Sequence, residues 1–196
     1  MKKFFAFFFV LVALFGCTNP PKQPPAGDVP GGTSTESYHA HADFLVVLDG
    51  QTIDFNKAEY MSTPYKELDE RVHLHDFVPT VIHFHAKGIA LNDFFESLGM
   101  SFDQNCFESG MQKFCNDGKK TLQFYVNGEP NSEFWNYKPV DLDKLLIYFG
   151  PTQAPPAIIS AVTNYACVYS KKCAPPPGFI AVPENCSIGQ PCELPK

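Results

Sequence analysis

The chain has 196 residues, with 15 Lys and Arg against 21 Asp and Glu, so its formal net charge is −6 at pH 7. This acidic balance argues against a nucleic-acid partner, which requires a basic surface to neutralise phosphate groups. The length suits one domain with a sizeable core and leaves little room for a second.

The first 16 residues predict an export signal. Lys2 and Lys3 precede the apolar run Phe4–Phe15, which is too short to cross a bilayer but has the length of a signal-peptide core. The end of this run, Leu14-Phe15-Gly16-Cys17, resembles the lipobox of bacterial lipoproteins, in which the cysteine is acylated and becomes the new N-terminus. We therefore expect Cys17 to attach the mature chain to a cell membrane or outer membrane, facing the extracytoplasmic side. An ordinary secretory signal followed by a spare thiol is the alternative.

Residues 17–37 predict a disordered tether. They are rich in Pro, Gly, Ser and Thr and contain almost no large apolar side chain, so they cannot bury enough surface to offset their ordering entropy. Residues 38–196 are then expected to form a single domain that ends in a tail rich in Pro and Cys.

Three hairpins are predicted from turn signals between apolar or β-prone runs. The first spans Tyr38–Phe55 with Asp49-Gly50 at its turn, the second joins Val72–His75 to Val81–His85 through Val78-Pro79-Thr80, and the third follows Thr121–Val126 with Asn127-Gly128 and returns near Phe134–Tyr137. The continuous apolar run Leu145–Phe149 suits a strand that is buried on both faces.

Two short helices complete the prediction. Apolar residues recur at helical spacing before Gly99 and again in a later segment: Leu91, Phe94, Phe95 and Leu98, and then Ile158, Val162, Tyr165 and Tyr169. The irregular stretch between the first two hairpins predicts a loop. The expected class is α+β, with a mainly antiparallel sheet of hairpins, one or two short helices and disulfide-stapled loops.

Cysteine usage agrees with export. Apart from Cys17 there is an even number, which in an oxidising compartment predicts disulfides, most simply between sequence neighbours: Cys106, Cys115, Cys167, Cys173, Cys186 and Cys192. Sequence alone does not fix their connectivity. The alternative is that some of these thiolates bind a soft metal ion.

All six histidines fall into three pairs of one pattern, His-x-His: His39 and His41, His73 and His75, and His83 and His85. On a strand, residues i and i+2 point to the same face, so each pair can present two imidazoles to one centre. A register centred on Pro79 would set His73 opposite His85 and His75 opposite His83, and the strand that carries the first pair would complete a patch of six.

Clustered imidazoles predict a transition-metal site. They suit copper or zinc, whereas calcium and magnesium prefer oxygen ligands. Asp43 and Asp76 are candidate ligands, or candidate partners that orient an imidazole through its second nitrogen. The alternatives are histidines that are satisfied within a core or sheet surface, and a pH switch built from their protonation.

The function predicted from these residues is capture, buffering or delivery of copper or zinc by a membrane-anchored lipoprotein. A metalloenzyme that activates water or oxygen with the same histidines is the alternative, and no catalytic residue or protein partner can be named.

The motifs also resemble those of a loosely defined set of uncharacterised exported or lipid-anchored proteins of bacteria and archaea. The resemblance covers a His-x-His strand, a His-Leu-His-Asp segment, an Ile-His-x-His segment and a short Phe-rich helix, here at residues 39–43, 73–76, 82–85 and 91–99. The resemblance implies that the three pairs form one site, but it does not indicate an activity.

Overall fold

The computed structural model describes residues 38–181. The predicted signal peptide, the acylation site Cys17, the tether and the cysteines Cys186 and Cys192 lie outside these residues. Within them, no helix has the length and apolar character that crossing a bilayer requires.

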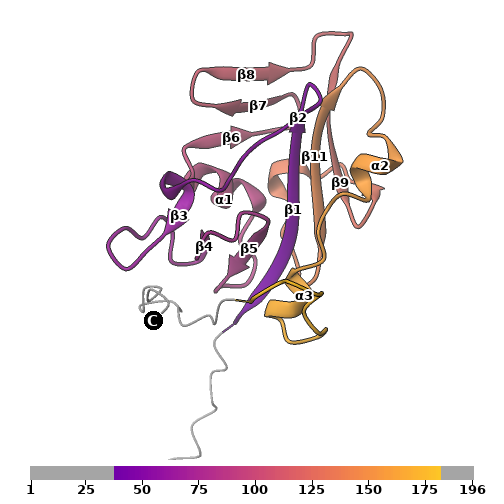
Figure 1. Cartoon of the computed structure of the whole chain (residues 1–196). Helices are drawn as coiled ribbons and strands as arrows, with labels where there is room; N and C mark the ends of the chain where they lie inside the picture. Colours follow the sequence, from indigo (N-terminus) through magenta and orange to yellow (C-terminus); the bar gives the residue numbers. More distant parts are fainter. Residues whose placement is uncertain (1–37, 182–196) are drawn as a thin grey trace, which may run out of the picture. The chain divides into compact units, whose positions relative to one another are not determined.

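A mixed sheet of eight strands forms the centre of the described chain (Figure 1). The order along the sheet is β10 (Glu129–Pro130), β9 (Thr121–Val126), β11 (Lys144–Gly150), β1 (Ala40–Leu48), β5 (Val81–Phe84), β4 (Val72–His75) and β3 (Met61–Ser62), with β2 (Gln51–Thr52) also paired to β1. The pairs β1–β11 and β3–β4 are parallel, and the other pairs are antiparallel. The predicted sheet with few short helices is present, but the expectation of a mainly antiparallel sheet is only partly right.

The parallel pair at the middle of the sheet explains this difference. The apolar run predicted as a buried strand is β11, and its residues 145–150 are all buried. It pairs with β1 in a register that places Lys144 beside Asp43, far away in the sequence. Turn signals reveal which neighbouring segments pair, and they carry no information on partners so distant.

Two predicted turns are confirmed. Asp49 and Gly50 join β1 to β2 with φ angles of 54° and 77°, and Asn127 and Gly128 join β9 to β10 with 54° and 88°. The predicted return strand near residues 134–137 is wrong, because the chain leaves the sheet after β10 and forms the 3-10 helix η2 (Phe134–Asn136). The aromatic side chains of η2 pack against the main core instead.

A second, smaller sheet contains β6 (Met100–Phe102), β7 (Cys106–Ser109) and β8 (Gln112–Cys115) in antiparallel order. Cys106 and Cys115 occupy directly paired positions on β7 and β8 and form a disulfide. The predicted stapled loop is therefore a stapled hairpin.

The first predicted helix is confirmed as α1 (Leu91–Ser97). The Asp93 carboxylate accepts a hydrogen bond of 2.9 Å from the backbone N–H of Ala90, which satisfies a donor at the helix N-terminus. Gly99 follows the helix with φ of 71°, the left-handed geometry that commonly ends a helix. The segment predicted as a loop contains a 3-10 turn, η1 (Ala58–Tyr60), and also the short strand β3, which the sequence did not predict.

The second predicted helix is divided into two single turns, α2 (Pro156–Ile159) and α3 (Ala166–Tyr169). Thr163 and Tyr165, between them, donate hydrogen bonds to the buried Asp43 carboxylate on β1, and this tertiary contact interrupts the helical run. A second disulfide, Cys167–Cys173, closes the turn that contains α3. Both described disulfides thus join sequence neighbours, as predicted.

The two faces of β1, β5 and β4 carry different chemistry. One face packs apolar side chains against Leu91, Phe94 and Phe95 of α1, and this is the main core. Val81 on the other face packs against Ala166 and Tyr169 of α3, which lies beside the first half of β1 in Figure 1.

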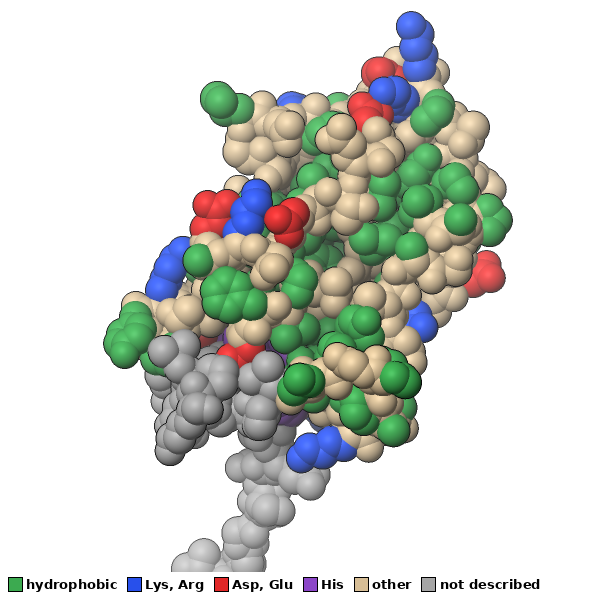
Figure 2. Space-filling model, in the orientation of Figure 1, with side chains coloured by type: hydrophobic (Ala, Val, Ile, Leu, Met, Phe, Trp, Pro, Cys, Tyr) green, Lys and Arg blue, Asp and Glu red, His purple; other side chains and the backbone are tan. Residues whose placement is uncertain are grey.

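Charged side chains of both signs are scattered over the surface drawn in Figure 2, with apolar side chains between them. The buried polar residues of the described chain are better indicators of a functional site, because burial of a polar group is costly unless it has partners. Five of the eight are histidines: His41, His73, His75, His83 and His85.

Candidate metal centre

All three His-x-His pairs lie on the face of the sheet that points away from the main core. His41 on β1 is the Cα partner of His83 on β5, and His83 is also the partner of His73 on β4. These three residues form a row across adjacent strands, and directly paired residues share a face. His39, His75 and His85 are each two positions from a member of that row, so they share the face as well.

The predicted register of the second hairpin is wrong by two residues. The structure pairs His73 with His83, so the hairpin is centred on Val78 rather than Pro79. The loop between the strands begins with a turn that is closed by a hydrogen bond of 3.0 Å from Val78 N–H to the His75 carbonyl, and the central residues of this turn, Asp76 and Phe77, both have positive φ. A register shift of two residues leaves each side chain on the same face of the sheet, so the four histidines still share one face.

Ring contacts join the six imidazoles, which we call the histidine cluster, into a closed cycle. The centroid distances around it are 4.6 Å for His39–His41, 4.6 Å for His39–His85, 4.9 Å for His73–His85, 5.6 Å for His73–His75, 3.9 Å for His75–His83 and 4.9 Å for His41–His83. The predicted ring pairs, 73 with 85 and 75 with 83, are therefore both in contact. They meet diagonally across the ladder, although their Cα atoms are not partners.

Three members of the cluster have the spacing of metal ligands. One ring nitrogen each from His39, His41 and His83 lies within 4.8 Å of the other two. His41 and His83 are at most 2% exposed, whereas His39 is exposed and forms the edge of the trio. An ion bonded to imidazole nitrogens at about 2.0 to 2.1 Å fits within such a trio after small side-chain movements.

Oxygen atoms from the later part of the chain fix His41. Its Nδ1–H donates to Ser170 Oγ at 2.7 Å, and the Ser170 hydroxyl donates to Asp141 Oδ1 at 2.5 Å. Asp141 also accepts the backbone N–H of His41 at 3.0 Å. Because the proton is on Nδ1, the lone pair of His41 is on Nε2, which is the arrangement of histidines that bind a metal through Nε2.

Charge on Asp141 supports this arrangement. Burial raises the pKa of Asp141, but hydrogen bonds from Lys172, Ser170 and the His41 backbone outweigh it and hold the pKa below its ordinary value. The carboxylate therefore stays ionised and remains an acceptor for Ser170.

His73 and His75 are oriented by acceptors on their own hairpin. His73 Nδ1–H donates to the carbonyl oxygen of Asp69 at 2.7 Å, with Glu67 Oε1 3.3 Å away. His75 Nδ1–H donates to Asp76 Oδ2 at 2.6 Å. Asp76 thus has the orienting position that the sequence suggested for it, and both rings carry their lone pair on Nε2.

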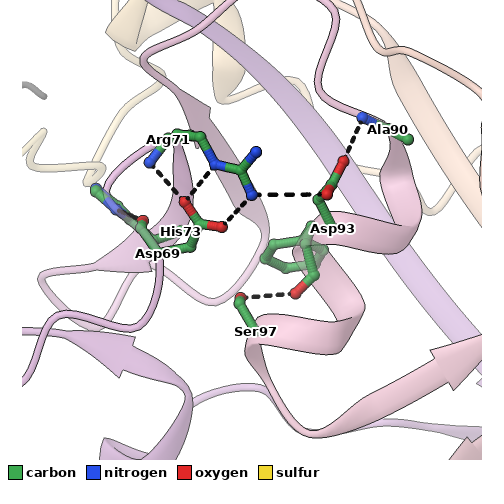
Figure 3. Close-up of polar contacts among 7 residues, drawn as sticks. Asp69, Arg71, His73, Ala90, Asp93 and Ser97 are labelled. Carbon is green, nitrogen blue, oxygen red and sulfur yellow. Dashed lines mark hydrogen bonds and ion pairs between the residues drawn. The ribbon is translucent and has the colours of Figure 1, made fainter.

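Figure 3 shows the contacts that fix Asp69, the residue whose carbonyl accepts the hydrogen bond from His73. The Asp69 carboxylate accepts two hydrogen bonds from the Arg71 guanidinium, at 3.0 and 2.7 Å, and Arg71 also reaches Asp93 of α1 at 3.6 Å. Burial raises the pKa of Asp69, but the contacts with Arg71 lower it more, so the carboxylate is ionised. The backbone that presents the Asp69 carbonyl is in this way tied to helix α1.

Asp43, the other predicted carboxylate, is buried and has a different partner. Its oxygens accept hydrogen bonds from Thr163 Oγ1 at 2.5 Å, from Tyr165 N–H at 2.7 Å and from Ala166 N–H at 3.0 Å. Within the described residues it makes no hydrogen bond to an imidazole. Its role in the structure is to hold the start of α3 against β1.

Helix α3 covers part of the histidine cluster. The ring of Tyr169 lies 5.8 Å from that of His41 and 5.3 Å from that of His83, measured between centroids. Asp43 fixes the start of this short helix, and the Cys167–Cys173 disulfide fixes the turn that follows it. The cluster is thereby enclosed between the sheet and residues from the end of the described chain.

The pH dependence of stability should report the burial of His73. Burial lowers its pKa to about 4, from an ordinary value of 6.5, although the bond to Asp69 opposes this shift. Between these pH values the unfolded chain binds a proton that the folded chain does not, so stability falls as the pH falls from 6.5 to 4. The shift corresponds to about 3 kcal/mol. Urea unfolding of the metal-free protein across this range measures it, and the slope should flatten in a His73→Asn variant. An equal slope in both proteins would contradict the assignment.

Sequence analysis missed three residues that hold the cluster: Asp69, Asp141 and Ser170. Asp141 lies shortly before the buried strand β11, so a carboxylate there was a weak signal of a polar contact at the strand end. Ser170 is 129 positions from His41, and no local pattern connects the two. Asp69 contacts His73 through its backbone carbonyl, which every residue type has, so its side chain gave no signal of this contact.

Comparison of the chain with models of protein families, with curated proteins and with solved structures found no match in any of the three. The resemblance to exported proteins with repeated His-x-His pairs stays a prediction.

Proposed function

We propose that this protein is an exported, membrane-anchored lipoprotein that binds copper or zinc through the histidine cluster in order to capture, buffer or deliver the ion. The observation that carries the proposal is the trio of His39, His41 and His83, whose ring nitrogens lie within 4.8 Å of one another. Three imidazoles that converge on one face of a sheet would repel one another if protonated, and a bound cation removes that cost.

The donor set supports the choice of metal. Imidazole nitrogen suits zinc and copper, and copper(II) binds most tightly among the divalent ions of the first transition series. Calcium and magnesium ions prefer oxygen ligands and would bind these nitrogens only weakly. Ser170, Asp69 and Asp76 hold the Nδ1–H groups of three rings in place, so little reorganisation is needed when Nε2 becomes a ligand.

Burial favours binding over catalysis. A catalytic metal needs a coordination position that is open to a substrate. Here His41, His73, His75, His83 and His85 are at most 4% exposed, and His39 is the exposed member through which an ion would enter. A largely enclosed imidazole site of this kind retains an ion and releases it through one edge, as capture or delivery requires.

Location outside the cytoplasm is supported by the lipobox resemblance around Cys17 and by the disulfides Cys106–Cys115 and Cys167–Cys173. Disulfides persist in oxidising compartments and are rare where glutathione keeps thiols reduced. An extracytoplasmic protein would meet copper and zinc before they enter the cell.

Elemental analysis tests the proposal directly. We expect protein purified from its own compartment to contain at least one equivalent of copper or zinc per chain, and a His83→Ala/His85→Ala variant to contain far less. The folding of the variant is checked by circular dichroism. Absence of both metals from the wild-type protein, with no uptake on addition, would refute the proposed function.

A further inference from the structure

The histidine cluster contains more imidazoles than one ion can use. Beside the trio of His39, His41 and His83, a second trio consists of His73, His75 and His85. Its ring centroids are 4.9 Å apart for His73–His85 and 5.6 Å for His73–His75. The second trio contains two of the three rings whose tautomer is fixed by a described oxygen acceptor.

The six nitrogen ligands do not converge on one point. Around a single ion with metal to nitrogen bonds of about 2.1 Å, even opposite nitrogens would lie only about 4.2 Å apart. Among the described residues, the first trio is the one group whose ligand atoms all lie within 4.8 Å of one another. The cluster therefore does not form one six-coordinate site, and an ion in the first trio leaves the second trio unused.

The second trio has its own support. Asp69 and Asp76 direct the Nε2 lone pairs of His73 and His75 away from the acceptors that hold their Nδ1–H groups. These rings are 1% exposed, and His85 is 4% exposed. Orienting acceptors of this kind accompany most metal-bound histidines, and here they serve residues outside the first trio.

The two trios are in direct contact. His75 of the second trio lies 3.9 Å from His83 of the first, and His85 lies 4.6 Å from His39, measured between ring centroids. Ions held by the two trios would therefore be neighbours, as in two-metal sites whose ions are about 3.5 to 4 Å apart.

We propose that the histidine cluster is a dinuclear transition-metal centre, with one ion held by His39, His41 and His83 and a second held by His73, His75 and His85. The inference rests on the proposed function, because it uses the same cluster. The ligand atoms of the second trio do not all lie within 4.8 Å of one another, so its rings must move closer together to bind an ion, and its ion is therefore the weaker one.

Titration of the metal-free full chain with copper(II) tests this proposal. Calorimetry should show two equivalents, the first bound at least about ten-fold more tightly than the second. Electron paramagnetic resonance should count one spin per chain at one equivalent and fewer than two at two equivalents, because neighbouring copper(II) ions couple. A His73→Ala/His75→Ala variant should bind one equivalent and keep the first affinity.

Each other outcome is informative. One equivalent in the wild-type protein would overturn the dinuclear centre and leave the proposed function intact, whereas no binding at all would overturn both. Two equivalents in the His73→Ala/His75→Ala variant would also overturn the assignment. If this variant does not fold, the spin count of the wild-type protein decides, since two fully independent spins would place the ions apart.

Discussion

Replacing His41 and His83 together with alanine should weaken copper or zinc binding at the tighter site by about 10³-fold or more. Structural zinc sites with four ligands are worth about 10 to 16 kcal/mol, or about 3 kcal/mol per ligand, so the loss of two ligands removes most of the affinity. These residues are Cα partners on β1 and β5 and belong to the trio with ligand spacing. Competition with a chromophoric chelator at pH 7 measures the change.

The matched control is the double variant Glu108→Ala/Lys113→Ala. Glu108 and Lys113 are also a directly paired couple on antiparallel strands, and their ion pair is exposed on the smaller sheet, away from the histidines. We expect unchanged affinity in this control and a much smaller metal-induced rise in melting temperature in the His41→Ala/His83→Ala variant, which keeps only the weaker trio of His73, His75 and His85. Wild-type affinity in the histidine variant would show that the trio is not the binding site.

Replacing Asp43 with alanine should lower the free energy of unfolding by about 3 to 4 kcal/mol. The buried carboxylate accepts three hydrogen bonds from residues at and before the start of α3, and its removal leaves two backbone N–H groups without that acceptor. A hydrogen bond to a charged group contributes about 1.5 to 3 kcal/mol, and a buried donor left unsatisfied costs a similar amount. Urea unfolding, monitored by fluorescence and circular dichroism, gives the value.

Asp54→Ala serves as the control for this experiment. Asp54 is exposed and accepts one local hydrogen bond from Asn56 N–H, so its replacement should change stability by less than about 1 kcal/mol. Asp43→Asn should keep the wild-type metal stoichiometry, because Asp43 holds α3 rather than an ion. Loss of an ion in this variant would instead identify Asp43 as a ligand, and unchanged stability of Asp43→Ala would contradict the structural role.

The histidine cluster was largely predictable because it depends on one local rule, the two-residue period of a strand. The spacing of His73, His75, His83 and His85 placed all four rings on one face, and the predicted ring neighbours are in contact. The register was wrong because the connecting loop, residues 76–80, contains a further turn at Asp76 and Phe77, both at positive φ, besides the turn at Pro79 and Thr80. A bulky residue such as Phe77 rarely adopts that conformation, so the sequence favoured the turn at Pro79.

Features that depend on distant contacts were not predictable. The parallel pairing of β1 with β11 follows from packing of the whole sheet, and neither strand carries a signal of the other. The break between α2 and α3 follows from the hydrogen bonds that Asp43 accepts from residues 163–166. Helical spacing of apolar residues is a weak preference, and these tertiary bonds override it.

The distance in sequence between His41 and the residues that hold it has a consequence for the proposed export of the chain. Asp141 and Ser170 follow His41 by 100 and 129 positions, so a chain that emerges from a translocon with its N-terminus first presents imidazoles long before their supports. Domains with such remote pairings fold slowly. Under the proposed function, the support of His41 is therefore completed only after residue 170 has crossed the membrane.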